Sequence, residues 1–474
     1  MSASSPLYLT LAERLAVLIK SGTFTAGDRL PSIRQTSREH QKSITTVLEA
    51  YRILEDQGLI EGRQRSGYFV KPPEILKGQF AAAQKRPATP IVVEQSAIFE
   101  AVMDSVADHQ VVHFASAAPD DSMVPHAKLS TISHAIGRRL GPVALRYTPP
   151  MGHRVLRAAV SRKLLGSGID AGPDQIITTQ GATEALLLAL RATTKRGDIV
   201  AVECPTYFGI LNLVRDLGLK AVEIPVDPVT GLAIDDLERA LKKHRIAACL
   251  VQPNFQNPLG CLMPDDHKKR LAALSARHGF TLIEDDVYGE LSHHGPTPSS
   301  IALFGGDVIH CGSVSKTIAP GLRVGWVVPG QHLAEIKRLK TIQAPWNASM
   351  SELIVAEFLE AGGYDRHLRR IREVYLAQCT RLREEVIRHF PAGCQVSQPR
   401  GGFVLWLEMP PDFDSEVFAV RAIARGISVI PGSLFSSSGR MKNYVRLSCG
   451  RVIGERETAA IATLGQLAAE LMQR

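Results

Sequence analysis

Seven short apolar segments alternate with helix-like segments along the middle of the chain, and this alternation constrains the fold more strongly than any other feature. Apolar runs of this length, bounded by Gly, Pro and polar residues, predict buried strands. Strands separated by helices are typical of a mainly parallel α/β sheet. The helices expected between them include 183–193 and 265–278. The predicted strands are 176–179, 199–202, 221–224, 248–251, 281–284, 308–311 and 325–328.

The last part of the chain follows a different pattern. A charged helical segment at 331–340 is followed by the strand-like run 401–407 and by a final helix. We therefore expect a large lobe over about 110–330, which contains a mainly parallel seven-stranded sheet, and a smaller α+β lobe over about 331–474.

Residues suited to ligand binding follow the predicted strands at their carboxyl ends. Gly181, Ala182 and Thr183 join a strand to a helix, and small residues at a helix N-terminus let backbone N–H groups approach an anion. Other strands are followed by polar or aromatic candidates, namely Tyr207, Asn257, Asp285 and Tyr288. Because open α/β sheets bind ligands at this edge, we expect these side chains to form one site.

Lys316 follows another predicted strand, in the segment Cys311-Gly312-Ser313-Val314-Ser315-Lys316-Thr317. A lysine amine attacks an aldehyde once it loses its proton, and burial or neighbouring cations lower its pKa enough for that. Arg323, seven residues later, is suited to holding a phosphate through two hydrogen bonds. A lysine after a serine is common on protein surfaces, so the prediction that Lys316 forms a Schiff base depends on the other motifs.

Taken together and in this order, the motifs resemble the fold-type I pyridoxal 5′-phosphate (PLP) enzymes, the aspartate-aminotransferase superfamily, over about residues 110–474. The resemblance implies that Lys316 carries PLP as an internal aldimine and is the catalytic residue. Asp285 is then expected to pair with the pyridine nitrogen, so that the ring accepts electrons. Tyr288 and Asn257 are expected to bond the phenolic oxygen of PLP, and Tyr207 to stack on its ring.

The same resemblance assigns the remaining contacts of the cofactor and the substrate. Arg446, in the segment Tyr444-Val445-Arg446-Leu447-Ser448, matches the arginine that binds a substrate α-carboxylate. Ala117 stands where the family often has Gly, which puts the shape of the substrate pocket in question. The cofactor phosphate is assigned to Gly181, Ala182, Thr183, Ser313, Ser315 and Arg323, and to Tyr147, which matches a tyrosine that reaches it from a partner subunit.

The first 71 residues predict three helices followed by a β-hairpin. Ser32-Ile33-Arg34-Gln35 forms a capping box at the start of the second helix. A third helix starts at Ser43 and is expected to place Ile44, Val47, Tyr51 and Leu54 on one face. The segments 59–61 and 67–70 flank a turn and are expected to pair as strands. Three helices and a hairpin in this order form a winged helix-turn-helix.

The motifs of this segment resemble the GntR-type winged helix, including Ala26-Gly27-Asp28-Arg29-Leu30-Pro31-Ser32 and Ser66-Gly67-Tyr68-Phe69-Val70. The resemblance implies that the helix 43–57 enters the major groove of double-stranded DNA. The family usually has Arg directly after the serine that starts this helix, where this chain has Ile44. The residues expected to contact DNA are Arg34, Lys42, Thr45 and Thr46, with Arg63 and Arg65 on the wing.

A GntR head fused to an aminotransferase-like body is identified as a member of the MocR subfamily of transcription regulators. We expect a DNA-binding domain at 1–71, a linker at 72–109, where Pro is frequent, and a PLP-binding body at 110–474. The resemblance implies a head-to-tail homodimer on operator DNA. It also implies an effector that is PLP or an amino compound.

Composition narrows the class of protein further. A formal net charge of +8 permits nucleic-acid binding. No apolar run is long enough for a membrane span, and the N-terminal residues lack the pattern of a secretion signal, so a cytoplasmic location is expected. Seven cysteines without a C-x-x-C pair predict reduced thiols rather than disulfides, and no metal site is predicted.

The sequence leaves two functions open besides the sensing regulator. The chain has every residue type needed for transamination, so it is also interpreted as an active aminotransferase with an accessory DNA-binding head. In a third interpretation the PLP fold is vestigial and serves only as a scaffold. Whether the chain turns over a substrate is therefore not decided at this level.

Overall fold

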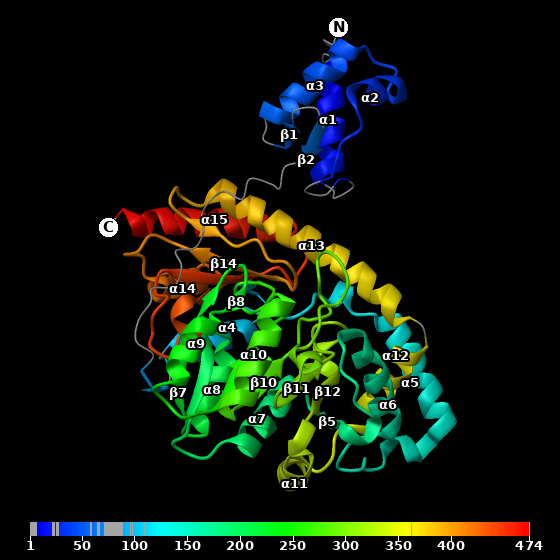
Figure 1. Ribbon diagram of the computed structural model, residues 1–474, viewed down its shortest axis with the longest axis vertical. Helices are drawn as coiled ribbons and strands as arrows, with labels where there is room; N and C mark the ends of the chain where they lie inside the picture. Colours follow the sequence, from blue (N-terminus) through cyan, green and yellow to red (C-terminus); the bar gives the residue numbers. More distant parts are fainter. Residues whose placement is uncertain are drawn as a thin grey trace. The chain divides into compact units, whose positions relative to one another are not determined.

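The computed structural model describes residues 7–20, 24, 28–56, 59–63, 67–70, 89–94, 96, 98–108, 110–361 and 363–473. The chain divides into two compact units, Met1–Ala81 and Ala82–Arg474, which we call the head and the body (Figure 1). No helix within the described residues is long and apolar enough to cross a membrane. All seven cysteines belong to the described residues and are free thiols, as the sequence predicts.

The head consists of three helices and a hairpin, which confirms the predicted winged helix-turn-helix. Strands β1 and β2 pair antiparallel, and Arg29 forms a further antiparallel bridge with Phe69 of β2. Ser32 caps α2, since its Oγ accepts a hydrogen bond from the backbone N of Gln35 at 3.3 Å. The elements are α1 (Leu7–Lys20), α2 (Ile33–Glu39), α3 (Ile44–Asp56), β1 (Ile60–Arg63) and β2 (Gly67–Val70).

The buried face of α3 is shorter than the sequence predicts. Val47, Tyr51 and Leu54 are fully buried against residues of α1 and β2. Ile44 has the helical spacing of this face, but its side chain is 55% exposed. Ile44 is the first residue of α3, and the turn that it begins extends beyond the part of the helix that packs on the core.

The body contains a sheet in the order β3-β7-β6-β9-β10-β11-β12-β5, with β8 paired to β7. The seven predicted strands are all present, and β3 and β8 add two at one side. Strands β7, β6, β9, β10 and β11 are parallel, whereas β12 runs antiparallel to both of its neighbours. The bounds are β3 (Ile91–Val92), β5 (Ile177–Thr179), β6 (Ile199–Cys204), β7 (Lys220–Asp227), β8 (Gly231–Leu232), β9 (Ile246–Val251), β10 (Thr281–Asp285), β11 (Val308–Ser313) and β12 (Gly325–Val328).

Helices cover both faces of this sheet. Alternate strand residues pack into different apolar clusters: Val200 and Val202 join a cluster with α7, α8 and α11, whereas Ala201 joins one with α9 and α10. Strands buried on both faces explain the continuous apolar runs in the sequence. The helices are α5 (His126–Leu140), α6 (Arg154–Leu164), α7 (Ala182–Thr193), α8 (Phe208–Asp216), α9 (Ile234–Leu241), α10 (Asp265–His278), α11 (Leu333–Gln343) and α12 (Ser349–Glu360).

The predicted linker, 72–109, is wrong in its second half. Ile91 and Val92 of β3 pair with β7. Residues 98–107 form α4, in which Ile98 and Val102 are buried and which packs on α14 (Ser415–Ile423). The apolar spacing of Ile98 and Val102 is typical of a helix. The helix directly follows a Pro- and Ala-rich stretch, however, and the whole range was therefore predicted as a linker. Residues 72–88 of the predicted linker lie outside the described residues.

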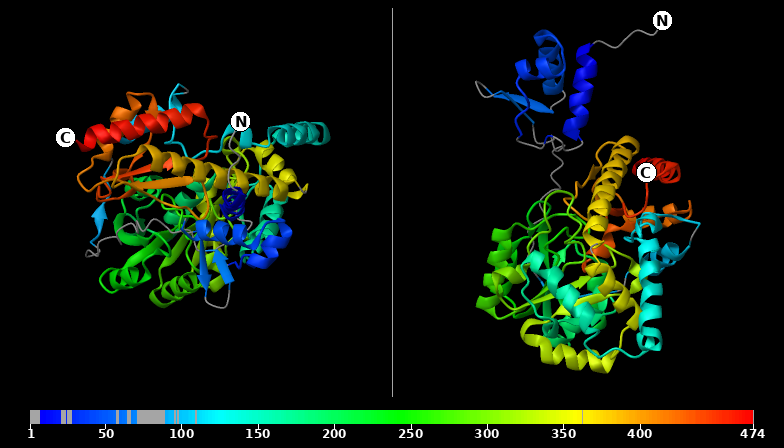
Figure 2. Two further views of the ribbon diagram at one scale, coloured as in Figure 1. Left: turned by 90° about the horizontal axis from the view of Figure 1, so that it is seen from above. Right: turned by 90° about the vertical axis from the view of Figure 1, so that its right-hand side faces the viewer.

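The small lobe is built on a second sheet, in the order β13-β14-β17-β16. The start of the body also joins this lobe, because β4 pairs parallel with β15. Helices α13 and α15 lie side by side, as Figure 2 shows. The elements are β4 (Val112–His113), α4 (Ile98–Ala107), α13 (Tyr364–His389), β13 (Gln395–Val396), β14 (Val404–Glu408), α14 (Ser415–Ile423), β15 (Ile427–Ser428), β16 (Ile430–Pro431), β17 (Tyr444–Ser448) and α15 (Glu455–Met472).

Candidate functional site

Lys316 lies three residues beyond the end of β11, and its ammonium group donates a hydrogen bond to the carbonyl oxygen of Ala117 at 2.6 Å. Burial is the main cause that lowers the pKa of Lys316 to about 8, and the cations Arg446 and Arg323 act in the same direction. The carboxylate of Asp285 opposes them. A lysine with this pKa has a substantial fraction of neutral, nucleophilic amine near neutral pH.

Asp285 ends strand β10 and is 4% exposed. Its Oδ2 accepts a hydrogen bond from the side-chain amide of Gln252 at 2.7 Å. Its Oδ1 is buried and has no hydrogen-bond partner among the described residues. Burial, followed by the charge of Asp286, raises the pKa of Asp285 to about 6. A buried oxygen without a donor is costly, so Oδ1 is suited to a ligand that brings a cationic N–H group.

Gln252 is a site residue that the sequence does not reveal. It directly follows β9, and besides its bond to Asp285 it accepts a hydrogen bond from the backbone N of Asn257 at 3.1 Å. Its own backbone N donates to Oε2 of the buried Glu203, also at 3.1 Å. Asn257 is 4% exposed, and its Oδ1 lacks a partner within the described part of the chain. The sequence did contain one indication of this role, because Gln252 directly follows the predicted strand 248–251 at its carboxyl end.

Two tyrosines lie beside Lys316 and Asp285. Tyr288 is 2% exposed, and its ring centroid lies 5.9 Å from the Lys316 Nζ. Tyr207 interacts electrostatically with both Asp285 and Arg446. Burial raises the pKa of both phenols above the ordinary value, so they are neutral donors at physiological pH. The structure therefore brings the two predicted tyrosines to the predicted lysine.

The residues predicted to hold a phosphate gather around the turn before α7. Gly181 has a φ of +92°, which L side chains rarely adopt, so another residue there would be strained. Arg323 in turn donates to the carbonyl oxygen of Gln180 at 2.7 Å. Ser313 and Ser315 are buried and share a hydrogen bond of 2.8 Å between their hydroxyls. Ala182 and Thr183 are the first residues of α7, where backbone N–H groups are free to bind an anion.

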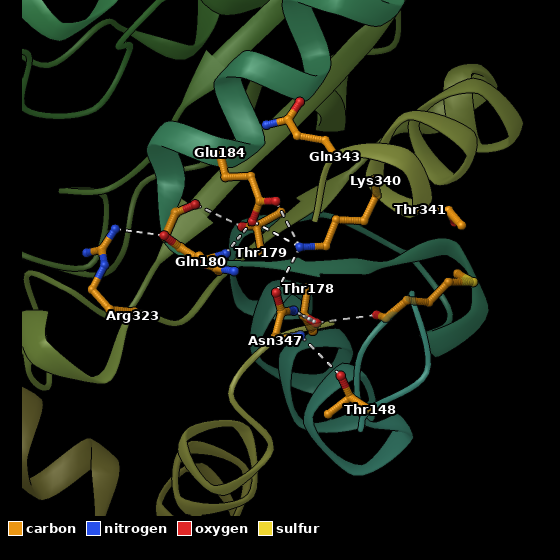
Figure 3. Close-up of polar contacts among 12 residues, drawn as sticks. Thr148, Thr178, Thr179, Gln180, Glu184, Arg323, Lys340, Thr341, Gln343 and Asn347 are labelled. Atoms are coloured by element: carbon orange, nitrogen blue, oxygen red, sulfur yellow. Dashed lines mark hydrogen bonds and ion pairs between the residues drawn. The ribbon is translucent and has the colours of Figure 1, made fainter. Parts of the chain in front are cut away.

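A network of polar contacts connects this turn to α11 and to Asn347 (Figure 3). Lys340 of α11 is fully buried and donates to both carboxylate oxygens of Glu184, at 2.9 and 3.0 Å. Glu184 in turn accepts a hydrogen bond from the backbone N of Gln180. Lys340 also donates to Asn347 Oδ1 at 2.8 Å, and the backbone N of Asn347 donates to the Thr148 hydroxyl. None of these residues was predicted as part of the site.

Arg446 lies on β17, in the small lobe, and is 2% exposed. One of its terminal nitrogens donates to the carbonyl oxygen of Ala115 at 2.5 Å. Its Nε and Nη1 are buried and meet no acceptor in the described parts of the chain. Burial lowers the pKa of Arg446 to about 10, so the group still carries its charge at neutral pH. A buried guanidinium cation with unpartnered N–H groups is suited to an anionic ligand such as a carboxylate.

Tyr147 is the predicted cofactor residue that the single chain does not bring to Lys316. Its side chain is 79% exposed and stacks on Trp346, with ring centroids 4.3 Å apart. Val143 and Leu145 are also exposed nearby in the chain, by 50% and 76%. The predicted role of Tyr147 requires a second subunit, and its exposure is compatible with that role.

In the head, α2 and α3 are held together by a buried polar contact. The Tyr51 hydroxyl donates to the carbonyl oxygen of Pro31 at 2.7 Å and lies 2.8 Å from the Thr36 hydroxyl. Arg34 and Thr45 are exposed, whereas Lys42 and Thr46 are half-buried. The Thr46 hydroxyl lies 2.8 Å from that of Ser43, which also accepts from the Thr46 backbone N at 3.1 Å. Arg65 and the side chain of Arg63 lie outside what the structure describes.

Comparison with known proteins agrees with these two units. The profile of the family "Aminotransferase class I and II" matches residues 109–460, and that of "Bacterial regulatory proteins, gntR family" matches residues 7–70. The chain is 36% identical to the uncharacterized HTH-type transcriptional regulator YjiR of Escherichia coli K12, over 98% of this chain and 99% of that protein.

Two solved structures resemble the body. LysN, an alpha-aminoadipate aminotransferase of Thermus thermophilus complexed with N-(5′-phosphopyridoxyl)-L-leucine, is 28% identical with a TM-score of 0.74, over 80% of this chain and 96% of that chain. The multiple substrate aminotransferase of Thermococcus profundus is 26% identical with the same TM-score and coverage. The chain therefore belongs to the aminotransferase class I and II family and carries a GntR-type helix-turn-helix domain, the architecture of the MocR subfamily of regulators.

Proposed function

We propose that the chain is a transcription regulator that binds operator DNA through the head and holds PLP on Lys316 in the body. Its effector is PLP itself or an amino compound that reacts with PLP. The observation that carries the proposal is the set of buried, unpartnered polar atoms on Asp285 and Arg446, both of which interact electrostatically with the amine of Lys316. Buried polar atoms without partners indicate a ligand that supplies them.

The residues present fit PLP. Asp285 Oδ1 would accept the proton of the pyridine nitrogen, and the N-terminus of α7 with Arg323 would hold the phosphate. Tyr288 and Asn257 would bond the phenolic oxygen, and Tyr207 would cover the ring. When bound, PLP supplies an aldehyde for amines and a ring that withdraws electrons. Lys316 would hold the cofactor covalently and exchange a proton at its Nζ.

The chemical class of the effector follows from Arg446. Its buried positive charge and its unpartnered Nε and Nη1 donors favour a carboxylate. The amine of the effector would meet the PLP aldehyde near Lys316. An α-amino acid carries both groups, so we infer an amino-acid-like effector. The backbone carbonyl of Ala117 accepts the hydrogen bond of Lys316, so the residue that stands where the family often has Gly lies at the site.

The regulator proposal is tested by titrating the full chain, with and without PLP, against its own upstream DNA at a stated salt concentration. Specific binding that changes with PLP or with an amino acid supports the proposal. Binding no tighter than that to random DNA of equal length would contradict it, since phosphate contacts alone give non-specific affinity. Rapid and selective half-transamination of one amino acid, without any effect on DNA affinity, would instead support the aminotransferase.

We further propose that the chain is a homodimer in which the exposed side chains of Val143, Leu145 and Tyr147 contact a second copy. Leu145→Asp is expected to shift the protein from dimer to monomer, because it places a charge in an apolar surface that includes Tyr147 and Trp346. Sedimentation velocity measures the change. Val229→Asp replaces an aliphatic side chain that is 63% exposed elsewhere in the body, and it is expected to leave the dimer intact.

The rate at which PLP attaches to Lys316 is expected to rise with pH up to about 8 and to level off above it. The neutral amine is the attacking form, and burial together with Arg446 and Arg323 lowers the lysine pKa to about 8. Below that pH the neutral fraction falls about tenfold per pH unit. Stopped-flow absorbance at several pH values measures the rate. A rate that still rises above pH 10, as for a free lysine side chain, contradicts the lowered pKa.

Gln252→Leu is expected to weaken PLP binding by roughly tenfold to a hundredfold. The substitution removes the hydrogen bond to Asp285, and a hydrogen bond to a charged group contributes about 1.5–3 kcal/mol. Equilibrium dialysis with PLP measures the affinity. Gln256→Leu is the matched control, because Gln256 is equally buried but bonds the carbonyl oxygen of Pro205 rather than Asp285. Equal losses in both variants would show that Gln252 acts only through packing.

A further inference from the structure

The first half of α3 carries two exposed aliphatic side chains. Ile44 and Leu48 are 55% and 45% exposed, and they lie four residues apart, so they share one face of the helix. Val47, Ala50 and Tyr51 of the same helix are fully buried. A single exposed aliphatic residue is ordinary. Two in succession on the second helix of a helix-turn-helix call for an explanation.

The surroundings of this aliphatic pair match double-stranded DNA rather than another protein. Exposed hydroxyl groups of Ser43 and Thr45 lie beside Ile44, and Arg52 follows Leu48 by one more helical turn. Arg34 and Arg38 are exposed on α2, which the Tyr51 contact ties to α3. Exposed cations on α3 and on the helix before it complement the phosphates that border a groove. Exposed Glu49, on the same helix, is suited to a cytosine amino group.

The position of the pair within α3 strengthens this match. In helix-turn-helix proteins the N-terminal residues of the second helix reach the base edges of the major groove. Ile44 is the first residue of α3. Four residues advance a helix by about 6 Å. Successive bases on one strand are about 3.4 Å apart, so the two side chains can reach bases up to two steps apart.

We propose that Ile44 and Leu48 read thymine by packing on its 5-methyl group in the major groove. Thymine is the base that presents a methyl group there, and apolar side chains recognise it by contact. This inference rests on the proposed binding of DNA by the head. It replaces a hydrogen-bonded contact at the start of the recognition helix with an apolar one, and it predicts operators with thymine at defined positions.

The test uses the full-length protein and a duplex selected by it from a random-sequence library. Each thymine of that duplex is replaced in turn by deoxyuridine, which lacks the 5-methyl group and retains the pairing edge. The dissociation constant is expected to rise about threefold to fourfold for each methyl group that Ile44 or Leu48 contacts. Replacement at the other thymines is expected to have no effect.

Two variants assign the contacts, and a third is the control. Ile44→Ala is expected to bind more weakly and to lose its sensitivity to deoxyuridine at one position, and Leu48→Ala at another. Such a double-mutant cycle cancels any effect of deoxyuridine on the duplex itself. Leu7→Ala removes an aliphatic side chain that is 59% exposed on α1, and it is expected to keep the full sensitivity. All three side chains are exposed, so the head is expected to remain folded.

Equal affinity of the wild-type protein for the thymine and the deoxyuridine duplexes overturns the inference, while DNA binding by the head stands. Sensitivity that persists unchanged in both Ile44→Ala and Leu48→Ala overturns it as well, because other residues then read the methyl groups. If no selected duplex binds better than random DNA, the proposed DNA-binding function fails, and the inference fails with it.

Discussion

Lys316→Ala is expected to abolish covalent attachment of PLP completely. The lysine supplies the amine for the bond, and this amine interacts with both Asp285 and Arg446 in the site. Borohydride treatment of the PLP-incubated wild type should fix the cofactor to the peptide that contains Lys316, and mass spectrometry should find no such peptide in the variant. The response of DNA binding to PLP or an amino acid should change with it.

Two controls separate the bond from the charge. Lys316→Arg keeps a cation beside Asp285 but cannot attach the aldehyde, so it should behave like Lys316→Ala in the mass measurement. Lys163→Ala removes a lysine that pairs with Glu290 at 2.8 Å, and it should retain the adduct. If Lys316→Ala leaves both the DNA affinity and its response to ligand unchanged, the proposed sensing function is wrong. The proposal that PLP binds at Lys316 is tested separately, by whether mass spectrometry finds the PLP adduct.

Lys340→Met is expected to destabilise the body by about 3–5 kcal/mol, because it leaves the carboxylate of Glu184 without its cation in a buried position. The same carboxylate holds the backbone of Gln180 at the phosphate turn, so PLP affinity should fall as well. Chemical denaturation monitored by the three tryptophans measures the loss, since Trp326, Trp346 and Trp406 all lie in the body.

The matched control lies on the same helix. Arg338 forms an exposed pair with Glu335 at 2.7 Å, and Arg338→Met should leave the stability close to that of the wild type. Adding Glu184→Gln to Lys340→Met should recover part of the loss, because the unpaired charge is then removed. A cost for Lys340→Met as small as that for Arg338→Met would show that the Lys340–Glu184 pair is not structural.

Local patterns made much of the fold predictable. The seven strands were predicted because each is a short apolar run. The helices of the head were predicted because their caps and their apolar spacing depend on residues that are close together in the sequence. Lys316, Asp285, Tyr288 and Arg446 were predicted from motifs, and the structure brings these four into one electrostatic neighbourhood. Residues that follow parallel strands lie together at the carboxyl edge of the sheet, and this proximity does not depend on how the rest of the chain folds.

The remainder depends on contacts between distant parts of the chain. Gln252 and Lys340 acquire their roles only when β9 and α11 are placed beside β10 and α7. The predicted capping box formed only in part, because Gln35 donates to Glu39 instead of returning to Ser32. Ile44 fits the apolar spacing of α3 but lies past the edge of the core. Helical spacing predicts which face a residue shares, not how far the neighbouring elements extend.

The apolar core of the head is its own. The cluster that contains Leu11, Tyr51 and Leu54 draws every buried member from residues between Leu11 and Val70. A unit that carries its own core takes its stability with it when it is joined to a different protein, even though a core of this size gives only a modest margin. The head is therefore expected to work as a transferable DNA-binding domain. If it is fused to another ligand-binding body, the fusion protein should bind the same DNA.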